Sequence, residues 1–408
     1  MPNPKNPVVT MYLEAIRQAP LAFYAYMVGT AENYELLSGA SSRTKGFSQL
    51  CLSYRIEMIK LVNEELQSIS GPPSDNLLGA IVVLAGNYVL FAGQVKIATL
   101  ESVHASRFRS PLRTAQFIHI YSSRPFRSPH SEALVRLVGM KGGCSKIQLP
   151  GVASTVELCD LVHASQTDSQ LYILPMDPPS LMSLVDLSLA VPSCPPVIWK
   201  QLPIFPGRRS QLLQVVEALS LVSNALEWYI KGSVPSIEFS EIVTARNAAQ
   251  YLLLSLVPAS VSGQDSSPET ASGNLFEVAR YGLKIFSNIV VFPMNPDGGT
   301  ARTLTLALKN SLTLCIEANP WQELPSSCKQ LLLWSFVLGG LQADDDRDDK
   351  RQNRGWFVTK FTEFFSLTEV LTWDQVKECL SAMLWSDSVL SLPAWEFWND
   401  AHERRAAH

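Results

Sequence analysis

Charged side chains are scarce in this sequence, at 17% of its 408 residues, against roughly 25% in an average soluble protein. The formal net charge is only −4 while 47% of the residues are apolar, which excludes a chain that stays disordered. The 21 glycines and 26 prolines are too few for a collagen-like or low-complexity chain. What remains is an apolar-rich globular protein without a bulk attraction for nucleic acid. Because a surface with few charges tends to be covered, this composition predicts association with protein partners.

Closely spaced cysteines are also missing. No two of the seven cysteines stand two to four residues apart, as a zinc site requires, and an odd, scattered set is no disulfide framework. We therefore expect a reducing compartment, thiols that serve as small buried side chains, no metal and no cofactor. The seven are Cys51, Cys144, Cys159, Cys194, Cys315, Cys328 and Cys379.

The common catalytic signatures are absent. The sequence holds no Gly-x-Ser-x-Gly elbow, no phosphate loop that ends in Gly-Lys-Ser/Thr, no Gly-x-Gly-x-x-Gly and no His-Glu-x-x-His. The six histidines offer no pair at metal-ligand spacing within one helix. The sequence thus predicts a protein that is not an enzyme.

One uncharged run of 20 residues, 76–95, is as long as a bilayer span. Three polar amides and three glycines interrupt it, and no basic cluster flanks it. A helix that is apolar all round is also typical of the centre of a large helical protein. We expect a buried helix here, no membrane association, and no secretory leader in the first 20 residues.

Helical periodicity dominates the rest of the chain, and alternating strand patterns are scarce. In 50–66, for example, Leu50, Tyr54, Met58, Leu61, Val62 and Leu66 recur at steps of three and four residues. Gly142-Gly143 predicts one helix end, whereas Pro325-Ser326 and Thr372 predict helix starts. The fold class is therefore all-α, a multi-helix array. Helices are expected at 8–27, 50–66, 75–103, 131–141, 151–164, 210–231, 237–256, 274–291, 300–317, 326–342, 355–366 and 373–387.

Three irregular inserts interrupt this array without dividing it. Residues 172–206 hold eight prolines, 260–274 are polar and serine-rich, and 344–354 are densely charged. No repeat at solenoid spacing is evident. We expect residues 1–408 to form a single helical domain with these inserts.

A basic stretch lies between Ser102 and Ser131, with five arginines, three histidines and no acid. It contains Phe-Arg-Ser-Pro twice, at 108–111 and 126–129. The stretch is interpreted as an exposed loop, as a footprint for phosphate-bearing partners, or as a loop regulated by phosphorylation of Ser110 or Ser128. The candidate partner-binding residues are Arg107, Arg109, Arg113, Arg124 and Arg127.

The acidic run Asp344–Asp349 contains Asp-Asp-x-x-Asp twice at the end of an apolar helix. In an all-α protein this resembles the Mg²⁺–diphosphate site of terpene cyclases, where carboxylates one helical turn apart bind hard cations. The second ligand set of such enzymes, Asn-x-x-x-Ser/Thr-x-x-x-Glu, is missing downstream. A solvated charged loop is therefore the preferred interpretation. A Mg²⁺-dependent terpene cyclase-like enzyme is the alternative hypothesis, and an acidic loop that docks a partner is a third.

Four stretches together resemble the regulatory region of fungal-specific transcription factors, the part that usually follows a two-zinc, six-cysteine cluster. Each is a core-helix pattern that is weak alone; their order and spacing carry the resemblance over nearly the whole chain. The stretches are 54–66, 132–143 with its closing Lys-Gly-Gly, 331–340 with Trp356-Phe357-Val358, and 371–376 leading to 384–388.

This resemblance implies an all-α regulatory domain, the middle homology region, that acts in transcription in the nucleus, often as a dimer and without catalytic residues. By analogy with lone fungal proteins of this type, the resemblance implies a stand-alone co-regulator of a fungal biosynthetic gene cluster in secondary metabolism, or a descendant that has lost its regulatory role. The zinc cluster is missing, so the resemblance predicts no direct sequence-specific DNA binding. A DNA-binding exon ahead of Met1 is an open explanation. The expected partners are a second copy or a zinc-cluster transcription factor, and the alternative location is the cytoplasm.

Overall fold

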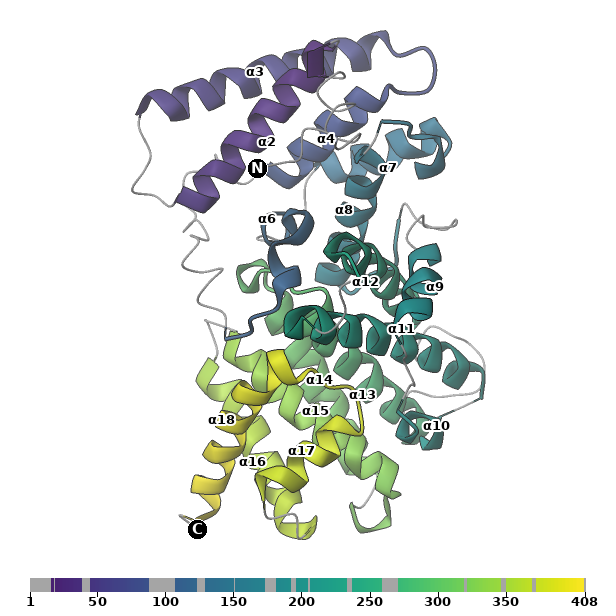
Figure 1. The fold of residues 1–408 in the computed structure, drawn as a ribbon, viewed down its shortest axis with the longest axis vertical. Coiled ribbons are helices and arrows are strands. Elements are labelled where there is room, and N and C mark those ends of the chain that lie inside the picture. The colour runs from purple at the N-terminus through teal and green to yellow at the C-terminus, as the bar shows by residue number, and fades with distance from the viewer. Residues whose placement is uncertain are drawn as a thin grey trace. The chain divides into compact units, whose positions relative to one another are not determined.

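The computed structural model describes most of the chain as helices, and no strand occurs among the described residues (Figure 1). The all-α prediction is confirmed for this part of the sequence. The described residues are 16–17, 19–38, 45–87, 107–122, 129–149, 151–172, 181–191, 196–204, 206–232, 237–258, 271–318, 321–345, 350–368 and 372–406.

The helices group into two compact units where the sequence favours one domain. Unit 1 comprises Met1–Ala105 and Gln116–Pro179, and unit 2 comprises Ser106–Ala115 and Ser180–His408. Each unit is described by itself. All nine tryptophans fall within the residues of unit 2, so tryptophan fluorescence reports on that unit alone.

Unit 1 is built around one apolar helix, α4, which packs against α2, α3, α7 and α8. Leu77, Leu78, Ile81 and Leu84 of α4 are almost completely buried, so the expected buried helix is confirmed as far as Asn87. Residues 88–103 of the range expected for this helix lie outside the described residues. The helices of unit 1 are α2 (Pro20–Ser38), α3 (Lys45–Ser68), α4 (Asp75–Asn87), α6 (Ile118–Tyr121), α7 (Pro129–Lys141) and α8 (Val152–Thr167).

The predicted stop after α7 is confirmed, and it forms a polar anchor in unit 1. Gly142 and Gly143 have φ values of 90° and 99°, a conformation that residues with a Cβ rarely adopt. This turn returns the chain so that the amides of Gln148 and Leu149 donate to Asp75 Oδ2 at 2.7 and 2.8 Å. Lys141 Nζ lies 2.7 Å from Asp75 Oδ1. The Lys-Gly-Gly segment therefore links the end of α7 to the start of α4.

We expect Asp75→Asn to lower the free energy of unfolding by about 1–3 kcal/mol, because an amide cannot replace the charged acceptor. Burial opposes ionisation of Asp75, but Lys141 and the two amides outweigh it and hold the pKa below its ordinary value. The stabilisation is thus present above the ordinary carboxyl pKa and is lost as pH falls through the folded one. Urea unfolding followed by circular dichroism measures it. Glu64→Gln, at an exposed position of α3, is the control. An equal loss of stability in this variant would contradict the role assigned to Asp75.

Unit 2 is a larger stack of helices whose core extends through nearly all of them. The stack also takes in Phe108 and Leu112 from the Ser106–Ala115 stretch, and both side chains are buried in its core. Its helices of nine or more residues are α9 (Leu181–Ala190), α11 (Pro206–Lys231), α12 (Phe239–Leu254), α13 (Ala271–Phe286), α14 (Thr300–Ala318), α15 (Ser326–Asp345), α16 (Lys350–Thr368), α17 (Trp373–Ser381) and α18 (Asp387–Ala406).

Helix α15 is the centre of unit 2, in contact with α13, α14, α16, α17 and α18. Its glycine pair permits this crowding: the Phe357 ring of α16 lies against Gly339, and the Phe397 ring of α18 lies against Gly340. On α13, Gly282 gives the same room to Trp334 of α15. Close helix packing thus depends on three positions without a side chain.

A line of polar groups crosses the interior of unit 2 beside a π-helical turn, η4 (Ser287–Val291), that continues α13. Ser287 Oγ donates to Gln250 Oε1 at 2.6 Å, and Asn288 Nδ2 donates to Gln342 Oε1 at 3.0 Å. The fully buried guanidinium of Arg246 donates to the side-chain oxygen of its neighbour Asn247 and stacks on Phe292. These hydrogen bonds offset part of the cost of burying the polar groups.

The expected helix ranges are wrong in three places in unit 2, one of which is the range 373–387, where the helix ends at Ser381. The proline-rich insert 172–206 is partly regular, since it contains α9 and the short α10 (Ile198–Gln201). The final helix α18 was not expected, and it runs through Pro393. Of the insert 260–274, residues 260–270 lie outside the described residues and 271–274 begin α13. The insert expected at 344–354 is largely helical: residues 344–345 end α15 and 350–354 begin α16, while 346–349 lie outside the described residues.

Within the described parts of the chain, no helix has the length and hydropathy needed to cross a membrane.

Candidate interaction surface

The structure describes three of the five candidate arginines and places them differently. Arg107 and Arg109 are exposed, and Arg107 forms an ion pair with Glu396 of α18. Arg113 is 7% exposed, so it is part of the interior of unit 2 and does not present its charge to a partner. Arg124 and Arg127 lie outside the described residues. Of the three described candidates, Arg109 is therefore the exposed cation for which no ion pair occurs among the described residues.

Burial of the first Phe-Arg-Ser-Pro copy contradicts the interpretation of its serine as a phosphorylation site. Ser110 Oγ is buried and donates to the carbonyl of Val290 at 2.8 Å. Leu112 offers its carbonyl to Arg246 at 3.3 Å, which fixes the next turn. A kinase could reach Ser110 only after this stretch leaves unit 2. Ser128 of the second copy lies outside the described residues.

The aspartate run is described only at its start. Asp344 and Asp345 end α15, and residues 346–349 lie outside the described part of the chain. Among the described residues, no group of three or more His, Cys, Asp or Glu side chains could hold a metal ion. The terpene cyclase-like hypothesis stays a prediction.

The described cysteines are free thiols, four of them buried. Burial, together with neighbouring acids, raises the pKa of Cys144 to about 11. Burial and the nearby Cys328 raise the pKa of Cys315 to about 12. Both thiols are protonated at neutral pH and hence poor nucleophiles.

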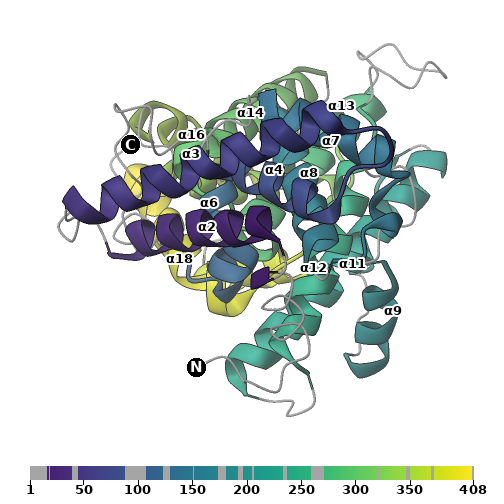
Figure 2. The ribbon, with the colours of Figure 1, turned by 90° about the horizontal axis from the view of Figure 1, so that it is seen from above.

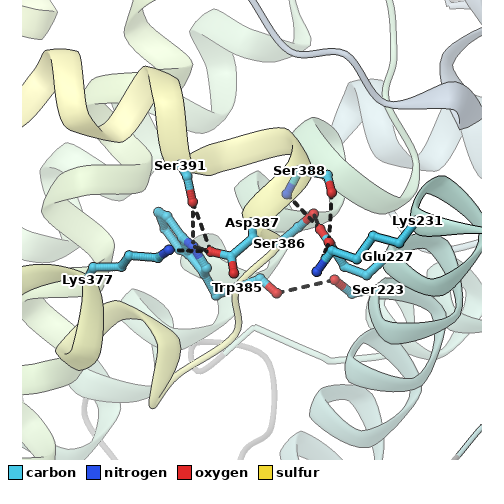
Figure 3. A network of polar contacts seen from close by, with 9 residues as sticks. All are labelled: Ser223, Glu227, Lys231, Lys377, Trp385, Ser386, Asp387, Ser388 and Ser391. Carbon is cyan, nitrogen blue, oxygen red and sulfur yellow. Dashed lines mark hydrogen bonds and ion pairs between the residues drawn. The ribbon is translucent and has the colours of Figure 1, made fainter. Parts of the chain in front are cut away.

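A cluster of polar contacts joins α11 to the N-terminus of α18 (Figure 3). Glu227 accepts Ser386 Oγ at 2.5 Å, the Ser388 amide at 2.8 Å and Ser388 Oγ at 2.7 Å. Lys231 Nζ lies 3.2 Å away. Burial opposes the charge, but these donors outweigh it and hold the pKa of Glu227 below its ordinary value. A carboxylate at a helix N-terminus that accepts from so many donors anchors the helix.

A second carboxylate completes this cluster. Asp387 Oδ1 accepts Ser391 Oγ at 2.9 Å and the Trp385 indole at 3.1 Å, and Lys377 lies 3.2 Å away (Figure 3). The stretch 384–388, one of the four that carry the family resemblance, is therefore the link that sets α18 against α11 and α17. Its role in this structure is architectural.

One surface of unit 1 is unusually apolar: a stripe along α3, from here on called the α3 stripe. Leu52, Ile56 and Ile59 are 44%, 55% and 38% exposed, and they follow one another at steps of four and three residues. Cys51, Met58 and Val62 of the same helix face inward and are buried. Helix α3 thus has two apolar faces, and unit 1 uses one of them.

Helix α2, which lies beside α3 (Figure 2), also carries exposed aromatic side chains, on the flank of α3 that holds Tyr54 and not on the flank of the stripe. Phe23 and Tyr26 are 37% and 43% exposed, and the Phe23 ring packs edge-on against Tyr54 of α3 with centroids 6.3 Å apart. An open pocket of about 510 Å³ begins beside Phe23 and Tyr24 at the start of α2.

The α3 stripe was missed in the sequence because the apolar positions of 50–66 were treated as one face. Of those positions, Met58 and Val62 are buried, whereas Leu50 is 47% exposed. A second apolar series at 52, 56 and 59 was available as a signal, since buried helices of a monomer need only one such series.

No family model, no curated protein and no solved structure matches this chain. The resemblance to the regulatory region of fungal transcription factors rests on the four stretches of the sequence and stays a prediction. The class of protein that fold and surface define is an all-helical protein with an exposed apolar helix face.

Proposed function

We propose that this protein is a helical interaction protein that acts in transcription regulation without enzymatic activity, and that it engages protein partners through the α3 stripe. The exposed isoleucines supply the observation that carries the proposal. Contiguous apolar surface that is rimmed by polar side chains marks protein-interaction sites. The resemblance of the sequence to fungal regulatory regions supplies the biological setting, a co-regulator in the nucleus.

Helix α3 suits this role physically. Recognition through an amphipathic helix uses apolar anchors at steps of three and four residues, which is the spacing of Leu52, Ile56 and Ile59. The exposed Lys60 flanks the stripe and forms an i,i+3 pair with the half-buried Glu57 at 3.9 Å, so this rim is polar. A DNA contact by this chain itself is not part of the proposal.

A tethering experiment tests the function. The full chain, fused to a heterologous DNA-binding domain in a fungal host, should change expression of a reporter with the matching operator. Ile56→Lys should return the reporter to the level of the DNA-binding domain alone, because a buried cation disrupts an apolar contact. Ser68→Lys adds the same charge to the same helix, and it should give the same reporter response as the wild-type chain.

Two outcomes would overturn the proposal. One is a reporter that does not respond to the tethered protein while a fluorescent fusion stays out of the nucleus. The other is release of pyrophosphate from a prenyl diphosphate in the presence of Mg²⁺, which would favour the terpene cyclase-like alternative.

A further inference from the structure

The stretch Ser106–Ala115 belongs to unit 2, although the chain on both sides of it belongs to unit 1. From here on it is called the strap. Its side chains alternate in exposure: Phe108, Ser110 and Leu112 are buried, whereas Arg109 between them is exposed. Alternation of this kind is how an extended peptide presents its side chains to a folded surface.

Three elements of unit 2 hold the strap through polar contacts. Ser110 Oγ donates at 2.8 Å to the carbonyl of Val290, in the last turn of the helix that α13 and η4 form. Carbonyls of a last turn have no donor within their helix, so the hydroxyl of the strap caps this end. Arg246 Nη1 of α12 donates to the Leu112 carbonyl at 3.3 Å. On α18, Glu396 forms an ion pair with the first arginine of the strap.

The surface under the strap, defined by Arg246, Val290 and Glu396, is from here on called the seat. It presents a donor, an acceptor and an anionic side chain, and the two apolar anchors of the strap enter the core beside it. The guanidinium of Arg246 is fully buried. A buried cation is costly unless acceptors surround it, so the seat favours a segment that offers a backbone carbonyl at this point.

We infer that the seat is a peptide-binding site and that the strap is its resident ligand. A segment of another protein with the same pattern, Arg-Phe-x-Ser-Pro-Leu, binds there when the strap leaves. The pattern follows from the contacts: a cation for Glu396, a hydroxyl for Val290, and an aromatic and an aliphatic anchor on either side of that hydroxyl. The inference concerns unit 2 and goes beyond the function proposed for the α3 stripe.

Backbone geometry at the end of the strap favours a reversible contact. Gln116, the residue after the strap, has a φ of 52°, a region that residues with a Cβ populate sparsely and at a cost. It lies in η2 (Pro111–Phe117), a 3₁₀-helix of seven residues, whereas such helices rarely exceed three or four. The strap is therefore held by its contacts with the seat against a strained backbone, and release relieves the strain.

Covalent attachment sets how often the seat is free. A ligand on a short flexible link acts at an effective concentration on the order of millimolar. A short peptide with two apolar anchors is expected to have a dissociation constant on the order of 10 µM. The strap then occupies the seat in roughly 99 of 100 molecules, and a free peptide competes for the remainder.

Fluorescence anisotropy of a labelled peptide of residues 106–115, titrated with the full chain, tests the inference. Ser110→Asp in the chain should release the strap, because a carboxylate cannot donate to the Val290 carbonyl and is costly to bury. This variant should bind the peptide about 100-fold more tightly than the wild-type chain does. Thr114→Asp places the same carboxylate at an exposed position of the strap and should bind as wild type.

The second Phe-Arg-Ser-Pro copy supplies a matched control peptide. Residues 124–133 align with the strap but have His130 in place of Leu112. Because Leu112 is fully buried, the 124–133 peptide should bind the Ser110→Asp chain at least about 10-fold more weakly than the 106–115 peptide. Equal affinities would contradict recognition through the anchors and overturn the inference.

Folding of each variant is verified by its tryptophan fluorescence melt, and the 106–115 peptide should raise the melting temperature of the Ser110→Asp chain. Phe108→Ala, which adds no charge, is a second variant and should show the same direction of change. A folded strap variant that binds the peptide no more tightly than wild type would overturn the inference.

Hydrogen exchange of the wild-type chain needs no variant. Strap amides should exchange through a local opening, well before those of α15. Strap amides as protected as those of α15 would mean that the strap leaves only when unit 2 unfolds, which would also overturn the inference. Neither result affects the tethered reporter, whose expected response depends on Ile56 in unit 1.

Discussion

Gly340→Ala should lower the melting temperature of unit 2 by roughly 5–10 °C, one of the largest effects expected of an added methyl group at the glycines that the structure describes. A Cβ at this position would overlap the ring of Phe397, well inside van der Waals contact. Overpacking of a dense core costs about 1–3 kcal/mol or more, and each kcal/mol lowers the melting temperature by about 2–4 °C in a domain of this size.

The overlap is costly because neither side can give way. Gly340 belongs to α15, which is buried along nearly its whole length, so the backbone cannot move outward. Phe397 is itself fully buried and packs edge-on against Phe361 of α16 with centroids 5.2 Å apart. Moving the ring therefore shifts α18 against both α15 and α16. Gly339→Ala should have a similar effect through Phe357.

Gly355→Ala provides the matched control, since it makes the same change within a helix of the same unit. The nearest atom to its new Cβ would be Arg404 Nη2, 4.0 Å away. Removing a helical glycine without a clash stabilises by up to about 1 kcal/mol, so this variant should melt slightly above wild type. Tryptophan fluorescence follows both, because every tryptophan belongs to unit 2.

A second substitution tests whether overlap with the Phe397 ring causes the lower melting temperature. If the Phe397 ring is the obstacle, Phe397→Leu combined with Gly340→Ala should cost less than the sum of the two single changes. A Gly340→Ala protein that melts with wild type, or a strictly additive double variant, would contradict the packing described for α15.

The helices could be predicted from the sequence where local chemistry decides. Thr372 accepts the Gln375 amide and forms the expected cap of α17, and Ser326 begins α15 directly after Pro325. Gly142 and Gly143 end α7 because only glycine adopts their backbone conformation easily. In each case the deciding interaction lies within three residues of the signal.

Tertiary contacts explain what could not be predicted. Pro393 indicates a helix end, yet α18 continues because Phe397 and its neighbours pack into the core of unit 2. Which ring covers Gly339 or Gly340 depends on helices more than 15 residues away. Burial of Arg113 likewise follows from the pairing of its stretch with the rest of unit 2.

The interaction surface, too, could be predicted only in part from the sequence. Composition alone indicated that some surface is covered by a partner, but it could not say which. The basic stretch drew the prediction because its charges are visible in the sequence, whereas the α3 stripe is defined by exposure. Exposure depends on which of the two apolar faces of α3 meets α2 and α4, a contact between separate helices.

Glu227→Gln should lower the free energy of unfolding of unit 2 by about 2–4 kcal/mol at neutral pH. Hydrogen bonds to a charged group contribute about 1.5–3 kcal/mol, and the amide leaves a buried donor facing Ser386 or Ser388. The link before α18 then loses its anchor on α11. Glu217→Gln, an exposed position on the same helix, should change stability by less than about 0.5 kcal/mol.

The pH dependence gives this prediction its sharpest form. Because the pKa of folded Glu227 lies below the ordinary value of 4.5, its carboxylate stabilises the fold above that pH. The stabilisation is lost as pH falls through the folded pKa, where the carboxyl group takes up a proton. The difference between wild type and Glu227→Gln, measured by urea unfolding with tryptophan fluorescence, should therefore be constant from pH 6 to 8 and shrink below about pH 4.5. A difference that stays constant down to pH 3 would mean that shape, not charge, holds α18 to α11.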